Sequence, residues 1–174
     1  MLTMIRNFFF AVALISAFAI SASPLPAGQS PEFSFRAVDG PTITSESLRG
    51  QVVVLGFGAS WLPLTRTQME GLKKVADQYA ERGVAVYWVS TESDSAKSKN
   101  FADDNQLREL GRKYKLTVLR DPDGAISKRF GVDQLPSTII INKQGQVAAT
   151  LNGLDASPNA DFAKQLSASL TKVL

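Results

Sequence analysis

The chain of 174 residues contains no cysteine and no histidine. Without cysteine it can form no disulfide bond and offers no thiolate nucleophile, and without histidine it has no imidazole base. The usual ligand sets for zinc and copper are excluded for the same reason, which leaves carboxylate and carbonyl oxygens as possible metal ligands. The acidic turn over residues 121–124 does not continue as a calcium loop, because residues 126–130 supply no acidic ligand. The sequence therefore predicts no metal site, and nothing in it indicates a cofactor.

An excess of charge of one sign is also missing. The chain has 19 lysine and arginine residues against 16 aspartate and glutamate residues, a net charge of +3, without runs of like charge. This pattern is typical of a mixed, solvated surface, so we expect no nucleic-acid partner. A hydrophobic fraction of 44%, with 12 glycines and 8 prolines, fits a single globular domain with one substantial core.

Residues 1–23 have the pattern of a secretory signal peptide. Arg6 is followed by an apolar run from Phe8 to Ile20, which is too short to span a bilayer comfortably, and then by small residues. Cleavage is expected after one of three triplets, Ala17-Phe18-Ala19, Ala19-Ile20-Ser21 or Ser21-Ala22-Ser23. The alternative is an uncleaved signal anchor, which would hold the protein at a membrane. The protein is expected to be exported, and periplasmic if the source is bacterial.

Residues 24–30 mix proline, glycine and serine without periodicity, so we predict a linker there and one domain over residues 31–174. Hydrophobic periodicity predicts an N-terminal hairpin, then alternating strands and helices, a second hairpin and a closing helix. The predicted strands after the first hairpin cover residues 51–57, 84–89, 116–119, 138–141 and 147–151. Residues 90–115 should hold a helix in their second half, preceded by a loose or short helical piece. Ser157 is the predicted N-cap of the closing helix, with Pro158 at its first position.

The most informative stretch is the strand-to-helix turn over residues 57–66, Phe-Gly-Ala-Ser-Trp-Leu-Pro-Leu-Thr-Arg. It resembles the active-site turn of thioredoxin-fold proteins of the TlpA/ResA type, a thiol-disulfide oxidoreductase family in which this turn reads Ala-Ser-Trp-Cys-Pro-x-Cys-Arg. In that alignment Leu62 and Thr65 occupy the positions of the two cysteines. The resemblance thus identifies a site at which this sequence has lost both sulfurs.

A second motif, Leu135-Pro136 ahead of a predicted strand, supports the resemblance. In the family a cis proline lies here against the active-site turn, and the backbone of the preceding residue pairs with a bound polypeptide. The resemblance therefore implies a cis bond at Pro136, with a trans proline at a strand end as the alternative. It covers roughly residues 31–174 and implies an α/β thioredoxin-like fold, with a central mixed sheet flanked by helices and an N-terminal β-hairpin.

Other positions also depart from the family pattern. The family has a glutamate three residues after its second cysteine and a proline two residues beyond, where this chain has Gln68 and Glu70. It commonly has a tryptophan just after the strand, where this chain has Gly58. The hydroxyl of Thr65 has no base beside it, because its neighbour is Arg66. Peroxiredoxin chemistry, from another branch of the superfamily, needs a cysteine as well, so no catalytic residue is predicted.

What remains at this site is an apolar surface, which we predict to bind a polypeptide or a partner subunit in a redox-inactive protein. The predicted binding residues are Trp61, Leu62, Pro63, Leu64, Leu135 and Pro136. One alternative is a relic whose leucines fold back into the core. Two others are a thiol-disulfide oxidoreductase or peroxiredoxin-like antioxidant protein that is active by an unrecognised route, and a structural domain of a cell-envelope assembly. A membrane is expected as a partner only if the N-terminal segment is retained.

Overall fold

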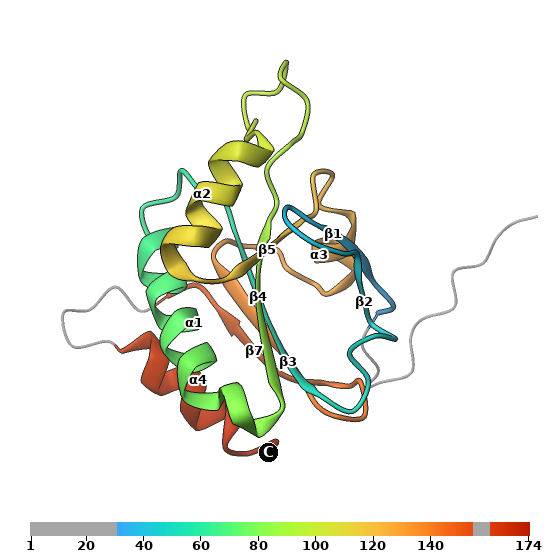
Figure 1. The fold of residues 1–174 in the computed structure, drawn as a ribbon, viewed down its shortest axis with the longest axis vertical. Helices are drawn as coiled ribbons and strands as arrows, with labels where there is room; N and C mark the ends of the chain where they lie inside the picture. Colours follow the sequence, from blue (N-terminus) through green and yellow to red (C-terminus); the bar gives the residue numbers. More distant parts are fainter. Residues whose placement is uncertain (1–30, 155–160) are drawn as a thin grey trace, which may run out of the picture.

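The computed structural model describes residues 31–154 and 161–174 (Figure 1). The predicted signal peptide and linker, and the predicted helix cap at Ser157 and Pro158, lie outside the described residues. In chain order the elements are β1 (Ser34–Ala37), β2 (Ile43–Thr44), β3 (Val52–Gly58), α1 (Thr65–Tyr79), the 3₁₀ helix η1 (Ala80–Arg82), β4 (Val84–Ser90), α2 (Asp104–Tyr114), β5 (Thr117–Arg120), α3 (Ala125–Arg129), β6 (Ser137–Ile141), β7 (Val147–Asn152) and α4 (Phe162–Leu170).

The seven strands form one mixed sheet in the order β2-β1-β5-β4-β3-β6-β7. β3 pairs in parallel with β4 and antiparallel with β6, and β4 pairs in parallel with β5. β6 and β7 form the predicted second hairpin, and β1 and β2 form the first. This arrangement, in which parallel crossovers are followed by an antiparallel pair, confirms the predicted thioredoxin-like fold.

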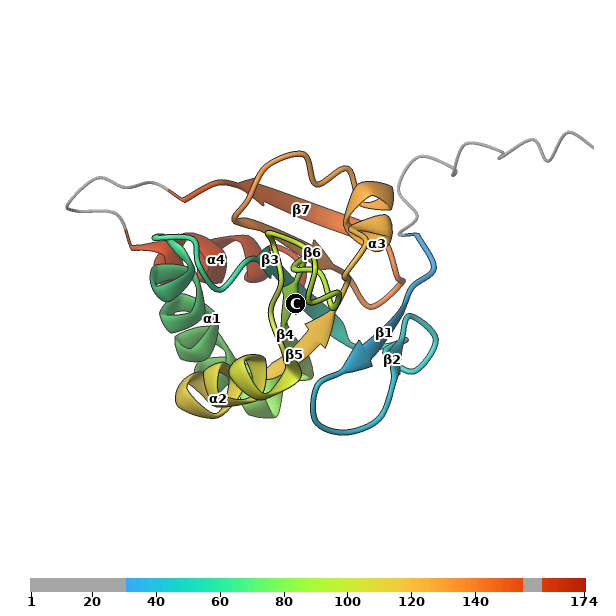
Figure 2. The ribbon, with the colours of Figure 1, turned by 90° about the horizontal axis from the view of Figure 1, so that it is seen from above.

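Both faces of the sheet are covered, and for this reason every residue of β3 is buried. α1, α2 and α4 cover one face of the sheet, while α3 covers the other together with the β1–β2 hairpin, the edge of the sheet that curls over this face (Figure 2). The core under the three helices includes Val52, Val54, Met69, Leu72, Val75, Trp88, Leu107, Val118, Ile140, Phe162, Leu166 and Leu170. On the opposite face the ring of Phe130 packs 5.9 Å from that of Phe33 and 6.0 Å from that of Phe57, measured between centroids.

α1 and α4 approach closely because Gly71 has no side chain. A Cβ atom at this position would collide with the ring of Phe162. α4 begins at Phe162 and its N-cap is Asp161, whose side chain accepts a hydrogen bond from the Lys164 amide. This contact between the two helices fixes the position of α4 beside the helix that carries the candidate site.

The structure also settles the polar stretch ahead of α2. Residues 91–103, all of them described, contain no helix, so this stretch is a loop and not a second short helix. α2 starts at Asp104 with Asp103 in a capping box with Gln106. The N-terminal hairpin does more than predicted, because β1 also pairs with β5 and so joins the main sheet. No helix in the described part of the chain is long and apolar enough to cross a membrane.

Candidate functional site

The site is the turn between β3 and α1. The Leu62 amide donates to the carbonyl of Ala59 at 3.1 Å, and the Thr65 amide donates to the carbonyl of Leu62 at 3.1 Å. The next bond, from the Gln68 amide to the Leu64 carbonyl at 3.0 Å, belongs to α1 itself. Leu62 and Thr65 therefore lie one tight turn apart at a helix N-terminus, as the resemblance implies.

The two former cysteine positions have unequal environments. Leu62 is partly exposed and belongs to neither core cluster of the described residues, whereas Thr65 is only 3% exposed. The hydroxyl of Thr65 donates to the carbonyl of Ala59 at 2.5 Å. A buried hydroxyl whose proton is engaged by a carbonyl oxygen is not available as a nucleophile.

The apolar side chains around Leu62 remain at the surface. Trp61 is 64% exposed, Pro63 is exposed and Leu64 is partly exposed. Like Leu62, Leu64 lies outside both core clusters of the described residues. The alternative in which both leucines fold back into the core therefore finds no support in the packing.

Beneath the turn, Gln68 is completely buried and fully hydrogen-bonded. Its Nε2 donates to the carbonyls of Phe57 at 3.3 Å and Ser137 at 3.0 Å, and to Oγ1 of Thr138 at 3.3 Å. Its Oε1 accepts a 3.0 Å bond from the indole of Trp88. One neutral amide thus joins α1 to β3, β4 and β6, which is a structural role.

Gly58 allows this arrangement. A Cβ atom at this position would lie 3.0 Å from both Oε1 of Gln68 and Nε1 of Trp88. Where the family commonly has a tryptophan just after this strand, the present chain has no side chain, and the indole of Trp88 from β4 occupies the adjacent space. The sequence gave no indication that Trp88 lies beside Gly58, because this contact depends on which residues of β3 and β4 are neighbours in the sheet.

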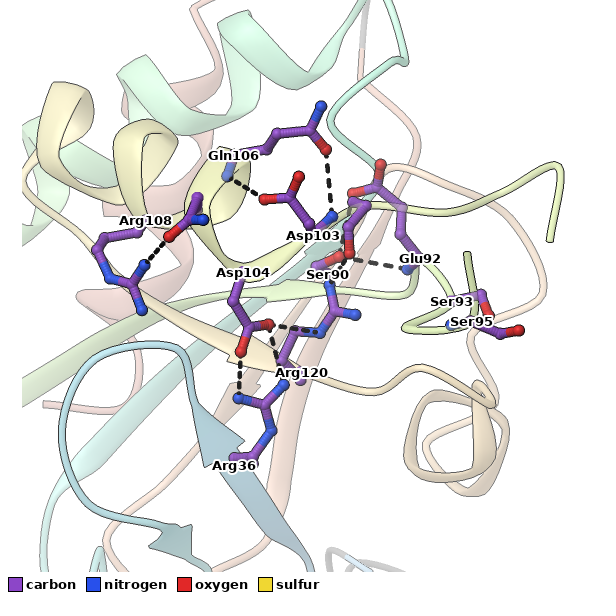
Figure 3. Close-up of polar contacts among 12 residues, drawn as sticks. Arg36, Ser90, Glu92, Ser93, Ser95, Asp103, Asp104, Gln106, Arg108 and Arg120 are labelled. Atoms are coloured by element: carbon purple, nitrogen blue, oxygen red, sulfur yellow. Dashed lines mark hydrogen bonds and ion pairs between the residues drawn. The ribbon is translucent and has the colours of Figure 1, made fainter. Parts of the chain in front are cut away.

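Glu92 holds the turn from the other side, and the sequence analysis did not identify it. Glu92 is 1% exposed, and its carboxylate accepts bonds from the amide of Ser60 at 2.9 Å and from Oγ of Ser60 at 2.6 Å. It also accepts a 3.0 Å bond from Oγ of Ser90, which lies beside it in Figure 3. Parallel strands end at the same edge of a sheet, so a polar residue just after β4 comes to lie beside the turn just after β3. This rule could have identified Glu92 from the sequence, because Glu92 follows the predicted strand over residues 84–89.

The indole of Trp61 is oriented by the same loop. Its Nε1 donates to Oδ1 of Asn100 at 2.8 Å, while the amide and hydroxyl of Thr91 both donate to the carbonyl of Gly58, at 3.0 and 3.2 Å. The edge of the ring is therefore tied to the β4–α2 loop, and much of its surface stays open to solvent. An exposed aromatic side chain held in one orientation loses little further freedom when a ligand covers it.

The Leu135–Pro136 peptide bond is cis, which confirms the prediction. Pro136 itself is buried, and Leu135 is partly buried against the core on the α3 face. The Pro136 carbonyl accepts a 2.8 Å bond from the Gly153 amide. Because Phe57 pairs with Ser137, this step lies beside the turn that follows β3. Of the predicted binding residues, Pro136 therefore shapes the backbone and exposes little surface.

A charged cluster at the start of α2 anchors the far end of the loop. Asp104 accepts two bonds from Arg36, at 2.7 and 3.0 Å, and lies 3.7 Å from Nε of the buried Arg120 (Figure 3). The hydrogen-bonded Arg36 holds the pKa of Asp104 below its ordinary value. Arg120 also donates to the carbonyl of Ala102 at 3.1 Å. Among the described residues, no group of three or more acidic side chains is arranged to hold a metal ion.

The chain is similar to known proteins over most of its length. Residues 26–150 match the AhpC/TSA family. The thiol-disulfide oxidoreductase ResA of Bacillus thuringiensis subsp. konkukian is 26% identical over 125 residues, which cover 72% of this chain and 68% of ResA. The thiol:disulfide interchange protein DsbE of Pseudomonas aeruginosa is 28% identical over 138 residues, covering 78% of this chain and 68% of DsbE.

Solved structures agree on the fold. The pneumococcal exposed lipoprotein thioredoxin Etrx1 of Streptococcus pneumoniae superposes with a TM-score of 0.66 and 25% identity, covering 82% of this chain and 99% of Etrx1. A secreted disulfide oxidoreductase of Mycobacterium tuberculosis superposes with a TM-score of 0.62 and 24% identity, covering 80% of this chain and 95% of that protein. These relatives carry names from disulfide chemistry, whereas the present chain has no cysteine.

Proposed function

This chain belongs to the AhpC/TSA family, and we propose that it is a redox-inactive member that binds a polypeptide or a partner subunit through its former active-site face. The proposed face consists of Trp61, Leu62, Pro63 and Leu64 on the turn, together with Leu135 and the backbone at Pro136. The observation that carries the proposal is the 64% exposure of Trp61 on a turn that Glu92 and Asn100 hold in place. Exposed aromatic and aliphatic side chains on a rigid support are typical of protein interaction sites.

Three features support redox inactivity. Position 62 holds a leucine, which cannot ionise, and position 65 holds a threonine with a buried, engaged hydroxyl. Thiol–disulfide exchange requires a thiolate as the attacking group, and this chain has none. Gln68, where the family has its glutamate, takes part only in the neutral network described above. Positions 62, 65 and 68 therefore hold side chains that contribute apolar surface or internal packing, and none of the three can take part in thiol–disulfide exchange.

Export to the periplasm or the cell exterior is part of the proposal. It is supported by the signal-peptide pattern of residues 1–23 and by relatives described as secreted or as an exposed lipoprotein. A polypeptide partner would then be another exported or envelope protein. Fractionation of cells that produce a C-terminally tagged chain would test this point, and recovery in the cytoplasmic fraction would contradict it.

The direct test of binding is site-specific photo-crosslinking in the native cell envelope. A photoreactive residue at Leu62 should give one dominant adduct with a partner, because that position lies at the centre of the proposed face. The matched control places the same residue at Gln144, which is exposed in the β6–β7 turn at the other end of the sheet. No adduct at position 62, or the same set of adducts at both positions, would support a relic or a scaffold instead.

Insulin reduction with dithiothreitol separates the proposal from the oxidoreductase alternative. The purified protein should leave the uncatalysed rate unchanged, because it has no thiol to carry electrons to the insulin disulfides. Turnover above the uncatalysed rate would contradict redox inactivity and favour an enzyme. That result would leave the crosslinking test of the binding face unaffected.

A further inference from the structure

The end of α2 that lies away from the site turn carries a strained residue. α2 ends at Tyr114, and its C-cap Lys115 has φ 53° and ψ 43°, the left-handed conformation. In the described part of the chain it is the one residue other than glycine with a positive φ. Glycine is the usual residue in this conformation, because a Cβ atom is disfavoured there. Lysine at this position therefore lowers stability, which points to another reason for its presence.

Lys115 lies at a hollow of about 270 Å³, which we call the α2 hollow. The hollow is formed by α2, the first residues of β5 and the two residues that follow β1. Since β3, β4 and β5 are parallel, the start of β5 and the turn that follows β3 lie at opposite ends of the sheet. None of the described residues that line the hollow belongs to the proposed binding face. The α2 hollow is therefore a separate site.

The charges at the hollow are predominantly positive. Its charged lining residues are Arg108, Arg112 and Lys115 on one side of the balance and Asp39 on the other. Nε of Arg108 donates to Asp39 at 2.6 Å, so these two charges compensate each other. Arg112 pairs with Glu109 in an exposed contact of 3.2 Å, and such a pair contributes little to stability and is easily exchanged. Lys115 makes no ion pair with a described residue. Two positive charges are thus left over.

The end of the helix does not account for these two charges. The carbonyl end of an α-helix carries about half of a negative elementary charge. Lys113, which is in the last turn of α2 and does not line the hollow, is enough to balance it. The charges of Arg112 and Lys115 therefore remain available to a ligand, and the sign of that ligand should be negative.

The buried lining residues of the α2 hollow are apolar. Val38, Leu107, Leu116 and Val118 are each at most 9% exposed, whereas both free cations are exposed. An apolar floor below two cations fits a ligand in which an oxyanion is attached to an apolar group, because each part of the ligand then gains its own contact. The volume is close to the lower limit of ordinary ligand sites, about 300 Å³, so the ligand should be a small molecule.

We propose that the α2 hollow binds a small organic anion, in which a carboxylate or a phosphate group is attached to a short apolar chain. Arg112 and Lys115 contact the oxyanion, and the chain lies against the buried apolar residues. This inference goes beyond the proposed function and does not depend on it, because the two sites share no residue.

The test is titration of the purified protein with hexanoate, followed by amide shifts in ¹H–¹⁵N NMR spectra. The shifts should be confined to the surroundings of the hollow, residues 107–118, with a Kd on the order of 1 mM for so small a ligand. Acetate lacks the apolar chain and hexanol lacks the charge, so each should bind at least about fivefold more weakly. Titration with hexyl phosphate separates the two oxyanions, because the tighter of the two hexyl probes identifies the class of anion.

Four variants test the residues. Lys115→Gly removes the amine and relieves the backbone strain, so the variant should fold and its affinity for the tighter probe should fall about fivefold. Arg112→Gln should cause a similar loss. Lys113→Gln is the matched control, because it removes the same charge from the last turn of α2 without changing the hollow, and it should cost at most about twofold. Asp39→Asn removes the acid and frees Arg108, so the affinity should rise at least about threefold.

Three results would overturn the inference. Equal losses of affinity in Lys115→Gly and Lys113→Gln would mean that overall charge attracts the anion and the hollow does not. Hexanol binding as tightly as hexanoate would mean that the cations take no part. Amide shifts away from residues 107–118, or none with either hexyl probe, would mean that the hollow is empty of such a ligand. Crosslinking at position 62 tests the proposed function separately in each case.

Discussion

The outer and inner sides of the site turn have diverged from the family in different ways. On the outer side, Trp61 and Leu62 present apolar surface to solvent and contribute to neither core cluster of the described residues. On the inner side, Thr65 and Gln68 are buried and each of their polar side chains is hydrogen-bonded. The two positions where the family has its cysteines therefore differ in this chain: Leu62 contributes apolar surface, and Thr65 is part of the hydrogen-bonded interior. Substitutions should change binding on the outer side and stability on the inner side.

The largest effect is expected from Gln68→Glu, which restores the glutamate of the family. A carboxylate here would face the carbonyls of Phe57 and Ser137, where the amide now donates. We expect a loss of about 3 kcal/mol in the free energy of unfolding at neutral pH, measured by urea titration. A matched control, Gln78→Glu on the exposed side of the same helix, should cost at most about 0.5 kcal/mol.

The same variant has a defined pH dependence. Burial and the facing carbonyls raise the folded-state pKa of the new carboxyl above its unfolded value of about 4.3. The penalty is therefore present at neutral pH and shrinks as pH falls through the raised pKa, because the folded protein then holds a neutral acid. A deficit that stays constant between neutral pH and about pH 4 would show that position 68 tolerates a charge, and would contradict the structural role of Gln68.

Glu92→Ala should have the next largest effect. It removes the acceptor for the amide and hydroxyl of Ser60 and for the hydroxyl of Ser90, so we expect a loss of about 2 kcal/mol in the free energy of unfolding. Glu70→Ala is the control, because Glu70 makes an exposed ion pair with Arg66 whose loss should cost at most about 0.5 kcal/mol. Equal effects of the two substitutions would mean that Glu92 does not hold the turn.

These inner contacts mark the limit of what the sequence could predict. The turn, the order of helices and strands along the chain and the cis bond at Pro136 followed from local patterns and the family resemblance. The roles of Glu92 and Asn100 depend on a loop that returns to the turn from more than thirty positions away. Periodicity carries no information on such contacts. The close approach of Trp88 to Gly58 likewise exists only because β3 and β4 are adjacent.

A smaller effect on stability is expected from Leu62→Cys combined with Thr65→Cys, which tests the alignment of the turn. The bond from the Thr65 amide to the Leu62 carbonyl already closes a tight turn, so the sulfurs should lie within disulfide reach. The pair should oxidise readily, and the thiol at position 62 should titrate below about 8.5 because it lies at a helix N-terminus. Thiol counting under a mild oxidant checks the first point. Leu62→Cys with Thr67→Cys is the control and should stay reduced.

The smallest change in stability is expected from Leu62→Asp, which should have its main effect on binding. Position 62 is partly exposed just before α1, and the first turn of that helix has no acidic residue, so an aspartate is tolerated there. We expect the free energy of unfolding to change by at most about 0.5 kcal/mol, and the affinity for the polypeptide partner to fall at least about tenfold. Titration with the partner, followed by the change in intrinsic tryptophan fluorescence, measures the affinity, and Trp61 is the exposed one of the two tryptophans.

Thr67→Asp separates charge from apolar contact in that experiment. Thr67 is exposed in the first turn of α1, so its substitution brings the same negative charge to the helix N-terminus without removing apolar surface. It should leave the affinity for the partner unchanged. Equal losses of affinity in both variants would mean that charge alone weakens binding. A loss of several kcal/mol of stability in Leu62→Asp would show that Leu62 packs into the core, because a charge forced into a core costs that much. Only a Leu62→Asp variant that is stable and binds its partner more weakly would show that Leu62 lies on a binding surface.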